Sequence, residues 1–179
     1  QFLKNIKEKL DLKVTIQYHF GNLNGTKFRN NCNKIADAIR INNAIDVATL
    51  MKYTTITCSS NIYKASDIQK GLDIISQAIQ QTLAWAIQEG KFRNDKEDLL
   101  VIANKLEVFT DPQAQQWVAQ AIQERKFGND KDILLAIANK LKIFTDPEAQ
   151  QIVAWAIKEG KFGNDKDVLL AIVNKLEVF

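Results

Sequence analysis

The chain has 179 residues, with 24 Lys or Arg, 21 Asp or Glu and one His, giving a net charge of +3 at pH 7. Its 46% hydrophobic and 25% charged residues are typical of a globular protein with a substantial core. The apolar runs are far shorter than the ~20 residues of a membrane-spanning helix, and the start shows no signal-peptide pattern. Cys32 and Cys58 form no CxxC or other ligand motif. We therefore expect free thiols, a cytoplasmic location and no membrane span.

The charge is distributed unevenly along the chain. Residues 1–65 carry ten basic and four acidic residues (10 − 4 = +6), whereas residues 66–179 carry fourteen basic and seventeen acidic residues (14 − 17 = −3). A basic region can attract an anionic partner such as nucleic acid, or it can be a solvated surface. Nucleic-acid binding by the first part therefore stands as the alternative functional hypothesis.

The first 65 residues are predicted to form a small α+β segment. Apolar residues at helical spacing indicate helices, and strict apolar–polar alternation indicates a strand with one buried face. Its two central helices also allow a helix-turn-helix interpretation, although no cluster of base-reading side chains accompanies them. The predicted elements are helix 2–10, strand 14–20, helices 28–41 and 44–52, and strand 53–58.

A long helix over residues 66–89 is predicted to join this segment to the rest of the chain. Ser66 and Gln69 have the spacing of a capping box, in which each side chain bonds to a backbone amide of the other. Apolar residues then keep to one face for over five turns. We expect a rigid join, with the domain boundary between residues 65 and 66.

The rest of the chain consists of three copies of a 35-residue unit. They span residues 75–109, 110–144 and 145–179, and the last two copies differ at nine positions, so 35 − 9 = 26 are identical. The motifs of tetratricopeptide and ankyrin repeats are absent. The fold class that we predict is mainly α, an α-solenoid-like array of three 35-residue helical-hairpin repeats preceded by the small α+β segment.

Each unit is predicted to contain two helices, A and B. In the third copy, Thr145 and Glu148 have capping-box spacing before helix A, and a Pro occupies the first turn. Gly160 supplies the left-handed residue that ends helix A. Asn164 or Asp165 then caps helix B, whose apolar residues continue to the end of the unit. These loops lack the ligand pattern of a calcium-binding EF-hand, which favours capping as the role of their acidic residues.

No group of residues in the sequence predicts catalysis. His19 is the single histidine, and no acidic or thiol partner lies near it in sequence. No metal-ligand or phosphate-binding motif is present. We therefore predict a protein that is not an enzyme and that has no cofactor and no metal.

The aromatic and basic residues of the repeats are the candidates for partner binding. Trp85 and Trp155 occupy equivalent positions beside the apolar stripe of helix A, and either seal the seam between repeats or anchor a partner. Lysines recur every 35 residues beside the turn and at the start of helix B, which predicts rows of solvated charge along an edge. The candidate partner-binding residues are Trp85, Gln120, Trp155, Lys91, Lys126 and Lys161.

The last helix of the third copy is as apolar as an interior one, although helical arrays normally end in a polar capping unit. We therefore expect either that the sequence is a piece cut from a longer protein or that this outer face meets another chain. The candidate terminal-face residues are Val168, Val173, Leu176 and Phe179. The functional hypothesis is a scaffolding module that belongs to a larger protein or assembly, binding a protein partner or a second copy of itself.

Overall fold

The computed structural model describes residues 33, 36–37 and 65–175, apart from the side chains of 65–69 and 72. Asn33, Ala36 and Asp37 are helical, inside the predicted helix 28–41. The other predictions for the first part lie outside the described residues, namely helices 2–10 and 44–52, strands 14–20 and 53–58, His19, Cys32 and Cys58.

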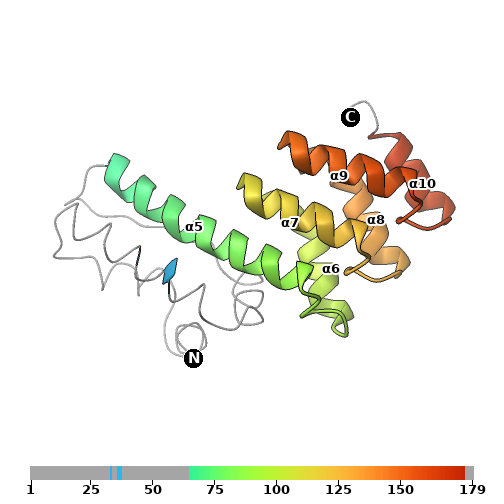
Figure 1. Cartoon of the computed structure of the whole chain (residues 1–179), viewed down its shortest axis with the longest axis horizontal. Helices are drawn as coiled ribbons and strands as arrows, with labels where there is room; N and C mark the ends of the chain where they lie inside the picture. The colour runs from blue at the N-terminus through green and yellow to red at the C-terminus, as the bar shows by residue number, and fades with distance from the viewer. Residues whose placement is uncertain (1–32, 34–35, 38–64, 176–179) are drawn as a thin grey trace. The chain divides into compact units, whose positions relative to one another are not determined.

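The described residues are mainly helical, which confirms the broad fold class (Figure 1). Within residues 65–175, no helix has both the length and the apolar character needed to cross a membrane. Six α-helices and two short 3-10 turns follow one another along this stretch. They are α5 (Ala65–Gln88), α6 (Lys96–Asn104), η1 (Leu106–Val108), α7 (Pro112–Gln123), α8 (Lys131–Asn139), η2 (Leu141–Ile143), α9 (Pro147–Lys158) and α10 (Lys166–Val173).

The chain divides into two compact units, Gln1–Thr82 and Leu83–Phe179. Helix α5 contributes to both units, and it begins at the residue before the predicted boundary. In the first unit, α5 buries Ile75 and Ala78, which are three residues apart on one helical face. Ser66 lies within the first turn of α5, so it is not the N-cap that the capping-box pattern predicted.

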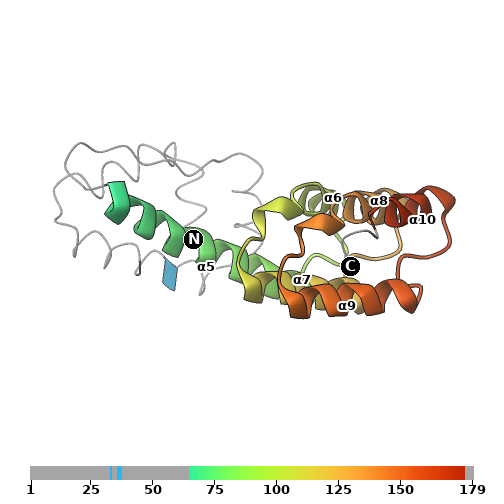
Figure 2. The same cartoon turned by 90° about the horizontal axis from the view of Figure 1, so that it is seen from above.

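The helices of the second unit form two layers, which the view from above separates (Figure 2). Helix α7 contacts α9 in one layer, and α8 contacts both α6 and α10 in the other. The A helices of the second and third copies therefore lie side by side, as do the B helices of all three copies. Each copy contributes one helix to each layer, and the turn between its two helices crosses from one layer to the other.

Five phenylalanines in the segments between the helices have almost no exposure. Three follow the A helices by a few residues, and two follow the 3-10 turns after the B helices. Burying a side chain of this size contributes about 1.5–3 kcal/mol, so these residues hold the chain wherever it changes layer. They are Phe92, Phe109, Phe127, Phe144 and Phe162.

The helix starts correct one prediction and confirm another. The N-cap of α9 is Asp146, whose Oδ1 accepts a hydrogen bond from the Ala149 amide at 3.0 Å. The predicted capping box of Thr145 and Glu148 is therefore wrong, because the helix begins one residue later with Pro147. Helix α10 is capped by Asp165, one of the two predicted residues, which accepts from the amides of Asp167 and Val168.

The helix ends also differ from the prediction in two respects. Gly160 has the expected positive φ of 67°, but the middle copy places Arg125 in the same conformation, with φ 57°. Helix α10 ends at Val173, well before the predicted end at residue 179. In the two earlier copies, the corresponding stretch leaves the α-helix for the 3-10 turns η1 and η2, so its apolar residues were wrongly assigned to helix B.

Candidate interaction site

The two candidate tryptophans lie at matching positions in the A layer, Trp85 on α5 and Trp155 on α9. Their side chains are 44% and 54% exposed, respectively. Gln120 holds the same position on the intervening α7 and is half-buried. Because α7 contacts α9, Gln120 and Trp155 lie on adjacent helices. Exposed indole rings favour the anchor interpretation over the seam, since a seam residue would be buried between helices.

The candidate lysines beside the turns have three different surroundings. The Lys91 ammonium lies 5.3 Å from the centre of the Trp85 ring, within the range of a cation–π contact. Lys126 and Lys161 instead form ion pairs with the glutamates two residues before them, Glu124 and Glu159, at 3.4 Å and 3.2 Å. The cation therefore covers the indole only in the first copy.

The structure buries one of the predicted terminal-face residues and exposes another. Val168 is buried, whereas Val173 is 60% exposed. Leu176 and Phe179 lie outside the described residues. Leu169 and Leu170 are also largely exposed, whereas Leu134, the residue of the middle copy that matches Leu169, is buried.

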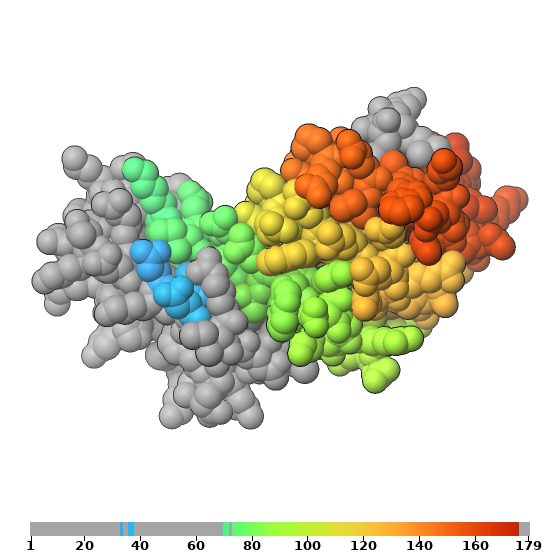
Figure 3. Space-filling model, in the orientation of Figure 1, coloured from blue at the N-terminus to red at the C-terminus, as the bar shows by residue number. Residues whose placement is uncertain are grey.

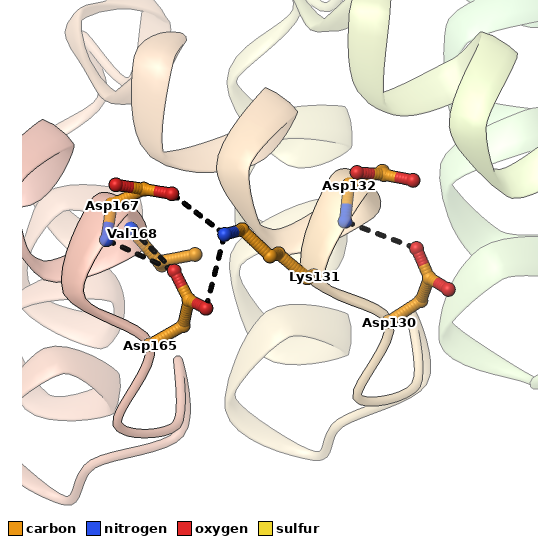
Figure 4. A network of polar contacts seen from close by, with 6 residues as sticks. All are labelled: Asp130, Lys131, Asp132, Asp165, Asp167 and Val168. Carbon is orange, nitrogen blue, oxygen red and sulfur yellow. Dashed lines mark hydrogen bonds and ion pairs between the residues drawn. The ribbon is translucent and has the colours of Figure 1, made fainter.

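A ladder of ion pairs links the starts of the B helices. The Lys96 ammonium lies 2.7 Å from an oxygen of Asp130. One copy further on, Lys131 lies 3.2 Å from Asp165 and 2.6 Å from Asp167, between the two carboxylates (Figure 4). At the starts of the B helices, the lysines that were predicted to form solvated rows form ion pairs with the next copy.

The ion pairs of the ladder lower the pKa values of two of its aspartates. The hydrogen bond from Lys96 lowers the pKa of Asp130, with help from the amides of Ile133 and Asp132. For Asp165, desolvation acts to raise the pKa, but hydrogen bonds from Lys131 and from two backbone amides outweigh it and lower the pKa. Both carboxylates are therefore charged near neutral pH, as an ion pair requires.

A buried glutamine, Gln115 on α7, forms the second link between copies. Its Nε2 donates to the Phe109 carbonyl at 2.9 Å and to the Ile143 carbonyl at 3.1 Å. Its Oε1 accepts from the amides of Thr145 and Asp146 at 2.9 Å and 3.0 Å. One side chain thus satisfies four backbone groups in the segments that enter two successive A helices.

Sequence reasoning missed this glutamine because a polar residue next to an apolar stripe usually faces solvent. One signal was present, since Gln80, Gln115 and Gln150 occupy the same position in all three copies. Within the described residues, no three His, Cys, Asp or Glu side chains are placed to hold a metal ion. Comparisons with protein-family models, with curated proteins and with solved structures gave no match.

Proposed function

We propose that this protein is a non-enzymatic interaction module, an α-solenoid-like array of three helical hairpins that binds a protein partner through its A layer. The observation that carries the proposal is the exposure of Trp85 and Trp155 at matching positions of that layer. Tryptophan is among the residues most enriched at the energetic centre of protein interfaces. The location that we propose for this binding is the cytoplasm.

The spacing of the two indoles suits an extended partner. They belong to the first and third copies, with the half-buried Gln120 at the same position between them. A partner segment that runs across the A helices would meet an aromatic ring, an amide and a second aromatic ring in turn. Each ring offers a large apolar area at a low cost in side-chain entropy.

The partner's chemistry follows from the charges around each ring. Lys91 lies against the first indole, so a carboxylate of the partner would find a cation there. At the third copy, Lys161 is already paired with Glu159. We therefore expect a segment with two apolar anchors and an acidic residue beside the anchor that meets Trp85.

The test is capture of partners by in-cell photo-crosslinking from position 120, followed by affinity measurement with the purified partner. The double variant Trp85→Ala/Trp155→Ala is expected to weaken binding at least tenfold and to leave the melting temperature unchanged. Leu170→Ala is the matched control, because this exposed side chain lies on α10 in the other layer. It should leave both values unchanged.

Two results would contradict the proposal. A fall of several degrees in the melting temperature of the double variant, with affinity retained, would show that the indoles stabilise the fold. An equal loss of affinity in Leu170→Ala would place the binding surface elsewhere.

Nucleic-acid binding by residues 1–65 is the second candidate, supported by their net charge of +6. Binding through phosphate contacts falls steeply with salt concentration. Retention on a mixed-sequence oligonucleotide that is lost as salt is raised would favour this function, and no retention at ~50 mM salt would exclude it.

A further inference from the structure

The outer face of the third copy repeats a surface that the middle copy buries. Leu134 of the middle copy is 8% exposed under the third copy, whereas its counterpart Leu169 is 44% exposed. Ala138 has no exposure, whereas its counterpart Val173 is 60% exposed. In the space-filling view, the third copy, coloured orange to red, lies beyond the middle copy at the end of the compact unit Leu83–Phe179 (Figure 3).

The polar groups of this face match those of the covered one. Gln150 is the counterpart of Gln115, and its Nε2 keeps the bond to the carbonyl before its own helix, that of Phe144, at 2.8 Å. Among the described residues, however, no group donates to the Gln150 Oε1, whereas the Gln115 Oε1 accepts from two amides. Lys166, the next rung of the ladder after Lys131, has no carboxylate partner in the described part of the chain.

We infer that this face is a docking site for a further helical hairpin of the same kind. The donors that match the Gln150 oxygen are two consecutive amides at the entrance to a helix, such as those of a Thr-Asp-Pro sequence. The group that matches Lys166 is a pair of aspartates at the start of a second helix.

A head-to-tail contact with a second molecule of this chain does not provide these groups. In the first copy, Ile75 and Ser76 stand where the third copy has Thr145 and Asp146, and both lie inside α5. Their amides are used within the helix, because an interior helical N–H bonds to the carbonyl four residues before it. The partner is thus a hairpin with a free helix entrance.

The test uses a synthetic peptide with the sequence of residues 145–179, titrated into the full chain. A peptide of this length forms little helix alone, so docking is expected to appear as a gain in helical circular dichroism at a 1:1 ratio. Gln150→Ala and Lys166→Glu in the chain should each weaken binding at least tenfold. Lys142→Ala is the control, because this exposed lysine lies in the middle copy, and it should bind normally.

Exchanging the charges of the lysine and the aspartates tests whether the ion pairs of the ladder contribute to binding. A peptide carrying Asp165→Lys and Asp167→Lys should bind the Lys166→Glu chain better than it binds the unmodified chain. Equal binding of both peptides to both chains would overturn the inference, as would the absence of any helical gain with peptide in large excess. A chain that dimerises through this face, with the dimer lost in Val173→Asp, would also overturn it by identifying the occupant as a second copy.

Discussion

Replacing Gln115 with alanine tests whether one buried side chain holds two successive copies together. The substitution removes four hydrogen bonds to backbone groups, with lengths from 2.9 Å to 3.1 Å. At about 1 kcal/mol for each bond, Gln115→Ala should lower the free energy of unfolding by about 4 kcal/mol. The same change at Gln150 removes a single bond, to Phe144, and should cost about 1 kcal/mol.

The comparison of these two variants separates the hydrogen bonds from the loss of side-chain packing. Urea unfolding followed by circular dichroism gives both free energies, and the expected difference of about 3 kcal/mol corresponds to one or more molar units of urea at the slopes usual for small proteins. Hydrogen exchange should show that the Thr145 and Asp146 amides lose their protection in Gln115→Ala. If Gln115→Ala costs no more than Gln150→Ala, the glutamine does not link the copies and the reasoning is refuted.

Two further predictions concern the turns and the ladder. Arg125→Gly should raise the free energy of unfolding by about 0.5–1 kcal/mol, because a non-glycine residue is strained at positive φ. For the same reason, Gly160→Ala should lower the free energy of unfolding by about 1 kcal/mol. Unchanged midpoints of urea unfolding would contradict both predictions. Since the pKa of Asp165 is lowered on folding, the pair with Lys131 should stabilise above the ordinary aspartate pKa of about 4 and lose its effect as the pH falls through the folded pKa. Lys131→Met should therefore flatten the acid limb of stability against pH, and 1 M salt should reduce its effect at pH 7.

Periodicity was sufficient to predict the helices of the second unit. The apolar spacing placed helices in all three copies, the prolines marked where helix A begins in the second and third copies, and glycines marked where it ends in the first and third. Helix starts were predicted to within a residue or two, as at Thr145, whereas α10 ends at Val173, six residues before the predicted end (179 − 173 = 6). At Thr145 the sequence offered two capping side chains in a row, and the proline that follows selects the second, Asp146, by fixing the first helical residue.

The links between copies were not predictable from one sequence. Pattern reasoning assigns a residue to the inside or the outside of its own helix, but the partners of Gln115 and Lys131 belong to the neighbouring copy. Whether such a polar group is buried depends on how closely two helices approach, which periodicity does not specify. Val173, by contrast, was named as a terminal-face residue from the sequence, and it is 60% exposed.

The ion-pair ladder gives the second unit a direction. Every rung described has its lysine on the earlier copy and its carboxylates on the later one. At the starts of the B helices, a copy therefore presents an ammonium group to the next copy and carboxylates to the previous one, whereas the pair of Lys140 with Glu107 has the opposite direction. Two outer faces of the third copy brought together would set Lys166 against Lys166, and this repulsion would select against pairing of like ends.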